Sequence, residues 1–258
     1  MGAVELARLR VSLGAALVGA ATPLAAADRL CTACVDLIDV DGASISLIEA
    51  GAMQGTFGSS GELSRMFDEL QFTYGQGPCL DAVRDNRPVT AANLDAPDEG
   101  RWPALTEAVL AHGIHAIYAL PVTVKSLPIG ALDLYRHRSG PLDGQALTGG
   151  LWAATLASLP LLDLMNADVD WQSAADGQDG WDQLASLERV EVYQATGMLI
   201  DAFGVNPADA VALLRSHAIA HGLTASDVAY RLLDRRLIPV DGELNLRNPQ
   251  DGSPVVPD

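Results

Sequence analysis

The chain has 258 residues, of which 49% are hydrophobic and 19% are charged, and its formal net charge is −17. This composition excludes a disordered or fibrous chain and suits one large or two ordinary domains, each with its own core. The strong negative charge disfavours a protein that holds nucleic acid along a basic surface, because lysine and arginine bind the phosphate backbone.

The cysteines indicate a reducing compartment. Cys31, Cys34 and Cys79 are too few, and odd in number, for a disulfide framework, so we expect a cytoplasmic protein. Cys31 and Cys34 have the spacing of a redox or metal-binding pair. They lie in an apolar, helix-like stretch without a second such pair, so we expect two small residues near a core and no metal.

Residues 1–27 allow two interpretations. Two arginines followed by an apolar run and three alanines are compatible with a secretory signal peptide. Glu5 and Pro23 argue against that interpretation, and leucines at helical spacing predict an amphipathic helix instead. No other apolar run reaches the roughly 18 residues of a membrane span, so we expect no transmembrane helix and no membrane partner.

The first 165 residues predict an α+β domain, an antiparallel sheet with flanking helices. In the first strand Ser44 and Ser46 alternate with apolar residues, which predicts a half-buried strand. The last two strands are apolar on both faces, which predicts a covered sheet. The predicted elements are helices at 3–21 and 24–40, strands at 43–49 and 53–58, helices at 63–72 and 79–85, a strand at 87–92, a helix at 102–112, strands at 114–124 and 129–135, and a helix at 142–165.

The chain changes character after this domain. Residues 166–182 are acidic, contain glycine and show no helical period, which indicates a linker. Residues 183–238 predict a small all-α bundle of three helices. Residues 239–258 are rich in Pro, Gly, Asn and Asp and are expected to be disordered.

Helix signals divide the C-terminal bundle. Gly204 ends the first helix, and Asn206 followed by Pro207 starts the second. Thr224 caps the third helix, with an aspartate three residues on as in a capping box. Two arginines, Arg235 and Arg236, are expected in the last turn of that helix, where cations suit the helix dipole.

The bundle resembles the ANTAR domain, a three-helix output module of bacterial regulators. One departure from the family pattern is Thr196, where the family usually has lysine, so a candidate phosphate contact is missing. The resemblance implies binding of stem-loop RNA that prevents a transcription terminator from forming, and action as a homodimer. The residues that carry the resemblance are Gln194-Ala-Thr-Gly-Met-Leu199, Ala210, Leu214-Arg215-x-x-Ala218 and Asp227-Val228-Ala229.

The segment 3–165 resembles a GAF domain of the type that is fused to ANTAR modules in actinobacteria. The matching residues are Asp41-Gly-Ala-Ser-Ile-Ser-Leu47, Gly75-Gln-Gly-Pro-Cys-Leu-Asp-Ala82, and Leu120-Pro-Val-x-Val124 leading to Ile129-Gly-Ala-Leu-Asp-Leu134. The resemblance implies a small molecule bound on one sheet face, or dimerisation. No Asn-Lys motif of cyclic-nucleotide-binding GAF domains is present, so the effector stays unnamed. The candidate ligand-binding residues are Tyr74, Gln76, Cys79, Trp102, His115, Tyr118 and Asp133.

Several of these residues have a structural alternative. Trp102 and Tyr118 can be core aromatics, and His115 at a strand start can be a hydrogen-bonded structural residue. Cys79 lies near a short helix N-terminus, where a lowered pKa would let the thiol sense oxidants, or it is a buried and inert thiol.

The net charge permits RNA binding once it is divided by domain. In 183–238 five arginines face six acidic residues, so this segment is near −1 and the rest of the chain carries about −16 of the −17. RNA loops can be read by stacking and base-edge hydrogen bonds, which need fewer cations than a duplex. The candidate RNA-binding residues are Arg189, Tyr193, Gln194, Gly197, Arg215, His217, Arg231, Arg235 and Arg236.

We expect four of these arginines, at 215, 231, 235 and 236, to converge with His217 and Tyr193 on one surface. The alternative is that they are solvated helix residues that balance the dipole. Gly197 has two interpretations as well, because a glycine in a long helix allows the close approach of either RNA or a neighbouring helix.

The leading hypothesis is a transcription antitermination regulator without enzymatic activity, controlled by a ligand or redox change at the first domain. One alternative is a DNA-binding helix-turn-helix protein. The second C-terminal helix carries only Arg215, and the third has its cations at its end, whereas recognition helices present reading residues near their start. A second alternative is a thiol enzyme like the GAF proteins that reduce free methionine sulfoxide, but the positions of the cysteines do not match one.

Overall fold

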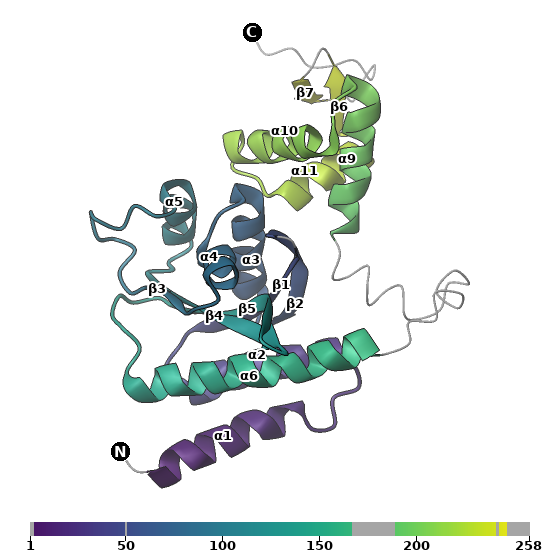
Figure 1. Cartoon of the computed structure of the whole chain (residues 1–258). Coiled ribbons are helices and arrows are strands. Elements are labelled where there is room, and N and C mark those ends of the chain that lie inside the picture. Colours follow the sequence, from purple (N-terminus) through teal and green to yellow (C-terminus); the bar gives the residue numbers. More distant parts are fainter. Residues whose placement is uncertain (1–2, 50, 167–188, 241–242, 247–258) are drawn as a thin grey trace. The chain divides into compact units, whose positions relative to one another are not determined.

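The computed structural model describes residues 3–49, 51–166, 189–240 and 243–246. They form two compact units, one with a five-stranded sheet and its helices, the other with three C-terminal helices and a hairpin (Figure 1). The predicted α+β class is confirmed. The predicted linker lies outside the described residues, except for Asn166 at the end of a helix.

Every predicted element of the first unit is present. Thr22 caps the second helix, and its Oγ1 accepts a hydrogen bond from the backbone N of Ala25 at 3.1 Å. Pro23 therefore starts this helix, whereas α1 ends earlier than predicted, at Leu17. The elements are α1 (Ala3–Leu17), α2 (Pro23–Leu37), β1 (Gly42–Glu49), β2 (Ala52–Ser59), α3 (Glu62–Tyr74), α4 (Pro78–Asp85), β3 (Val89–Ala91), α5 (Pro103–Ala111), β4 (Ala116–Val124), β5 (Leu127–Arg136) and α6 (Gly144–Asn166).

The sheet has the strand order β2-β1-β5-β4-β3, and all neighbours are antiparallel. Helices α2 and α6 cover one face, with α1 packed outside them, and α3 and α4 cover the other (Figure 1). The core on the α2/α6 face is apolar and includes Ile45, Leu120 and Leu134. The sheet is therefore covered on both sides, as the apolar last strands predicted.

Burial of the second face corrects one expectation. Ser44 and Ser46 were predicted on the open side of a half-buried strand, but both are fully buried beneath α3 and α4. The alternation correctly predicted two different faces of the strand. The prediction that the second face is exposed to water was wrong. A polar row in a strand can face a buried polar layer as well as water.

The second unit confirms the predicted helix signals. Gly204 follows the first helix in a left-handed conformation with φ of 65°. The Asn206 side chain accepts from the backbone N of Asp209 at 3.0 Å, and Thr224 and Asp227 form the complete capping box. The elements are α9 (Val190–Phe203), α10 (Pro207–Ala220), α11 (Ala225–Leu233), β6 (Leu237–Val240) and β7 (Glu243–Leu246).

The start of the expected disordered tail is instead a hairpin. β6 pairs with β7 in antiparallel register, from Leu237 with Leu246 to Val240 with Glu243. The rest of the predicted tail, 247–258, lies outside the described residues. α11 ends at Leu233, so Arg235 and Arg236 follow the helix rather than lie in its last turn, and Arg235 has φ of 56°.

The described part of the chain contains no single helix with the length and apolar character of a membrane span. α9 and α10 meet that criterion only as a pair bent by 107°.

Candidate functional sites

A buried polar group lies on the α3/α4 face of the sheet. The Gln71 side chain on α3 donates from Nε2 to Asp133 Oδ2 on β5 at 2.7 Å, and its Oε1 accepts from the backbone N of Cys79 at 3.1 Å. The three side chains are fully buried. A Cβ at Gly77 would lie 2.4 Å from Gln71 Oε1, so this glycine of the Gly-x-Gly-Pro-Cys stretch allows the loop to approach Gln71.

Asp68 is a second buried carboxylate on this face. Its two oxygens accept hydrogen bonds from Ser46 Oγ on β1 and Thr56 Oγ1 on β2. Ser46 and Thr56 are opposite each other in the β1–β2 register, so both hydroxyls point at one carboxylate on α3. Both oxygens of Asp68 therefore have a hydrogen-bond donor.

Asp133 is not satisfied in the same way. Burial raises the pKa of its carboxyl to about 8; the hydrogen bond from Gln71 acts in the opposite direction, and the charge of Asp68 adds to the rise. Within the described residues, Asp133 Oδ1 and Ser44 Oγ are buried without a hydrogen-bond partner, although Ser44 and Asp133 are opposite each other in the β1–β5 register. Two buried oxygens without partners are unusual in a folded core and mark a place for a further polar group.

The thiols are buried and protonated. Burial raises the pKa of the Cys79 thiol, and the nearby carboxylates of Asp133 and Asp68 raise it further. Its Sγ lies 3.7 Å from Met53 Sδ. The proposed low-pKa oxidant sensor is therefore wrong, and the alternative of a buried thiol holds. Cys31 and Cys34 are also free and buried, and burial raises the pKa of Cys34 to about 12.

Tyr118 does not belong to this polar group. It is opposite Leu134 in the β4–β5 register, whereas the next residue, Ala119, is opposite Asp133. Because neighbouring residues of a strand face opposite sides, Tyr118 lies in the apolar core under α2 and α6. Its hydroxyl donates to the Gly140 carbonyl. Tyr118 and Asp133 therefore lie on opposite faces of the sheet and do not share one site.

Trp102 and His115 have structural contacts within the domain. Trp102 is buried and donates from Nε1 to Asp81 Oδ2 at 2.9 Å, and His115 Nδ1 lies 2.6 Å from Asp95 Oδ2. Tyr74 is the last residue of α3, and Gln76 lies in the half-buried turn before α4. The structure thus brings together two of the seven candidates, Cys79 and Asp133, through Gln71.

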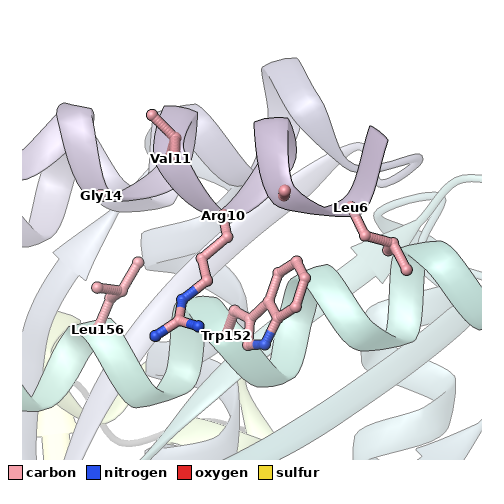
Figure 2. Close-up of a pocket in the computed structure, with 7 residues that line it drawn as sticks. Leu6, Arg10, Val11, Gly14, Trp152 and Leu156 are labelled. Carbon is pink, nitrogen blue, oxygen red and sulfur yellow. The ribbon is translucent and has the colours of Figure 1, made fainter. Parts of the chain in front are cut away.

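An apolar groove of about 700 Å³ lies between α1 and α6. Figure 2 shows Arg10 reaching from α1 to Trp152 and Leu156 on α6. Three valines at seven-residue spacing are strongly exposed: Val4 and Val11 on α1, at 69% and 71%, and Val18 directly after it, at 74%. Within the residues that the structure describes, no group of His, Cys, Asp or Glu side chains is arranged to hold a metal ion.

In the second unit, the predicted motif of α9 separates into two faces. Tyr193, Gln194 and Gly197 are exposed, whereas Ala195 and Thr196 are buried. A Cβ at Gly197 would meet nothing within 4 Å. The packing interpretation of Gly197 therefore finds no partner among the described residues, and its side of α9 is open. Thr196 stands where the family usually has lysine. Its hydroxyl donates to the Val192 carbonyl at 2.7 Å, within the same helix.

His217 and Arg231 lie together in a pocket of about 240 Å³. The His217 ring stacks on His221, with ring centroids 4.0 Å apart. The other wall is formed by the hairpin, through Leu237 and residues 244–246.

Arg215 is not part of that pocket. Two residues along an α-helix are about 200° apart around its axis, so Arg215 and His217 face different sides of α10. Burial and the charge of Arg189, the residue before α9, lower the pKa of Arg215. Arg236 pairs with Asp234 at 2.9 Å. The expected convergence on one surface is therefore wrong for Arg215 and His217.

The sequence reasoning missed several residues of both sites. Ser44, Asp68 and Gln71 were not candidates, because only the strand register brings Ser44 opposite Asp133. His221 was missed despite its four-residue spacing from His217, which places both rings on one side of a helix. Asn245 was missed because the hairpin was interpreted as tail.

Comparison with protein families decides the identity. The profile of the GAF domain family matches residues 20–155, which is more than half of the chain, and the profile of the ANTAR domain matches residues 183–233. The chain belongs to the GAF family and carries an ANTAR domain. The first unit is therefore called the GAF domain below, and the second the ANTAR domain.

Solved structures with similarity to this GAF–ANTAR protein are distant in sequence. The GAF domain from Acinetobacter phosphoenolpyruvate-protein phosphotransferase has 14% identity and a TM-score of 0.47, over 64% of this chain and 97% of that chain. The fRMsr of Staphylococcus aureus in its reduced form has 13% identity and a TM-score of 0.44, over 60% and 94%. The type II free methionine-R-sulfoxide reductase from Thermoplasma acidophilum has 16% identity and a TM-score of 0.38, over 62% and 96%. No curated protein matches the chain.

Proposed function

We propose that this protein binds stem-loop RNA through its ANTAR domain and acts as a transcription antiterminator under the control of its GAF domain. The combination of a GAF sensor domain with an ANTAR domain makes it a regulator of the ANTAR family. The RNA partner, the effector and the antitermination step are the proposal.

The open side of α9 is the observation that carries the proposal. Tyr193, Gln194 and Gly197 are exposed, and one turn of helix connects them, so they form a single surface. Glycine inside a helix costs about 1 kcal/mol relative to alanine. No described atom lies where a side chain at Gly197 would be, so packing inside the domain does not compensate this cost. In the proposal, the close approach of an RNA backbone compensates the cost of this glycine.

The effector of the proposal is a small polar molecule that reaches the α3/α4 face of the GAF sheet. Asp133 Oδ1 and Ser44 Oγ are the support, because they are buried and have no hydrogen-bond partner among the described residues. A redox signal is not part of the proposal, since the thiols are buried with raised pKa values. For the same reason we propose that the chain is not a thiol enzyme.

We propose further that the protein works as a homodimer in the cytoplasm. Val4 and Val11 on α1 are exposed and seven residues apart, which is the repeat by which helices pair in a coiled coil. Three free cysteines suit a reducing compartment.

The test of RNA binding is Gly197→Ala. The added methyl meets open space, so the variant should be about 1 kcal/mol more stable, because alanine favours the helix. If RNA approaches this side of α9, the same methyl should weaken RNA binding. Stability is measured by thermal unfolding, and affinity by fluorescence anisotropy with hairpins selected from a library that has a fixed stem and a randomised loop.

Gly144→Ala in the GAF domain is the matched control, because that helical glycine also has open space around its Cβ position. It should leave RNA binding unchanged. Equal RNA affinity of Gly197→Ala and wild type would show that RNA does not approach the open side of α9. Failure of the selection to enrich any hairpin, or displacement of the hairpin by duplex DNA at equal concentration, would refute the RNA-binding proposal itself.

A further inference from the structure

The pocket of the ANTAR domain has two walls of different origin. One wall comes from α10 and α11, through His217, His221 and Arg231. The other comes from the β6–β7 hairpin, which lies beyond residue 233, where the match to the ANTAR family ends. The pocket is therefore a feature of this chain and not of the matched segment alone.

The histidine pair provides a flat aromatic surface. The two rings are stacked at 4.0 Å with an angle of 25° between their planes. The Nδ1 atom of His221 lies 2.9 Å from the His217 carbonyl, which can only accept, so Nδ1 carries the proton. Burial, together with His221 and Arg231, lowers the pKa of His217, which favours its neutral ring. The two stacked rings offer a flat face that another aromatic ring can extend.

Hydrogen-bond donors complete the pocket. Arg231 offers a planar fork of N–H groups, and within the described residues no ion pair or hydrogen bond occupies it. Asn245 on β7 adds an amide that both donates and accepts. Leu237, Leu244 and Leu246 supply the apolar contacts around these polar groups. A pocket with apolar walls and a few polar groups that fix orientation is the usual form of a small-ligand site.

We infer that this pocket receives one unpaired purine base from the loop of the bound RNA hairpin, and the inference rests on the proposed RNA binding. Its volume of about 240 Å³ is below the range of pockets for drug-sized ligands and suits a single ring system. Unpaired bases of RNA loops are commonly stacked on aromatic side chains, histidine included, and bonded along their edges. Arginine and asparagine both pair with N7 of purines, an acceptor that pyrimidines lack.

A phosphate contact is the competing explanation for Arg231, and it makes a different prediction. Phosphate binding needs a positive charge, which lysine supplies as well as arginine, whereas the planar fork of arginine fits two acceptors of one base edge better than the point charge of lysine does. Stacked aromatic rings and leucine side chains suit the flat face of a base rather than a phosphate. The composition of the pocket therefore favours the base.

The experiment uses the full-length protein and the best hairpin from the randomised-loop library. Each loop nucleotide is replaced in turn by an abasic site, and each purine by a pyrimidine. For wild type, one position should stand out, with affinity weaker by about 5- to 150-fold, the range of base–aromatic stacking. His221→Ala and Arg231→Lys should bind the intact hairpin more weakly and lose most of the difference at that one position.

His112→Ala, at an exposed histidine of the GAF domain, is the matched control and should behave as wild type. Wild-type sensitivity at every loop position in both His221→Ala and Arg231→Lys would overturn the inference and leave RNA binding intact. Full retention of affinity by Arg231→Lys would assign Arg231 to a phosphate and also overturn it. A protein that binds no hairpin fails earlier, at the proposed function.

Discussion

Asp133→Asn tests the buried carboxyl on the α3/α4 face of the GAF sheet. Asparagine has nearly the same shape, and its side-chain oxygen can accept the hydrogen bond that Gln71 donates to Asp133. The substitution removes the ionisation and little else. Asp36→Asn, at an exposed position of α2, makes the same chemical change outside the buried layer.

The expected effect follows from the pKa of about 8 in the folded protein against 3.8 for a free aspartate. Between these values the folded state holds a proton that the unfolded chain has released, so the free energy of unfolding falls as pH rises. The slope is at most about 1.4 kcal/mol per pH unit, which gives about 2.7 kcal/mol between pH 5 and pH 7. For a domain of this size, that corresponds to about 5–10 °C in the melting temperature.

The assay is thermal or urea unfolding of the GAF domain signal in the full-length protein, at several pH values between 5 and 8. Wild type and Asp36→Asn should lose stability as pH rises, and between pH 5 and pH 7 Asp133→Asn should lose about 2.7 kcal/mol less. Parallel pH profiles for wild type and Asp133→Asn would show that Asp133 is already ionised in the folded state and would refute the reasoning from burial.

Other predictions concern thiols, caps and close backbone contacts. A thiol-reactive dye should label no cysteine quickly in the native protein and three after denaturation, because all three are buried; fast native labelling would contradict this. Thr224→Ala should destabilise the ANTAR domain by about 1 kcal/mol in urea unfolding through loss of the capping box, and an unchanged midpoint would count against that role. Gly130→Ala should destabilise the GAF domain by about 1–3 kcal/mol, since its Cβ would lie 2.3 Å from the Ser46 carbonyl oxygen; wild-type stability would disprove the close contact.

The sequence predicted the elements of the GAF domain well because their signals are local. Thr22 and Pro23 mark a helix start, and alternation marks the strands. The sequence predicted poorly which residues share the α3/α4 face, because that depends on how the strands pair. Tyr118 and Asp133 are polar residues of two neighbouring strands, and only the register shows that they belong to opposite faces of the sheet.

In the ANTAR domain too, local signals were interpreted correctly and a pairing of strands was missed. The caps of α10 and α11 were correct, since each lies within four residues of sequence. The β6–β7 hairpin was missed although Asp241-Gly242, a favoured hairpin turn pair, separates two short runs with apolar residues. High Pro and Asn content outweighed that signal. Without the hairpin, nothing in the sequence placed Asn245 near His217.

The pairing of β1 with β5 also separates two kinds of change that the GAF domain can accept. In β1, odd-numbered positions such as Ile45 pack under α2 and α6, and even-numbered positions such as Ser44 face α3 and α4. In β5 the numbering is reversed, with Leu134 in the apolar core and Asp133 on the α3/α4 side. A substitution on the α3/α4 side can therefore change the buried polar layer without disturbing the apolar layer, and related chains can vary one side of these strands while the scaffold remains the same.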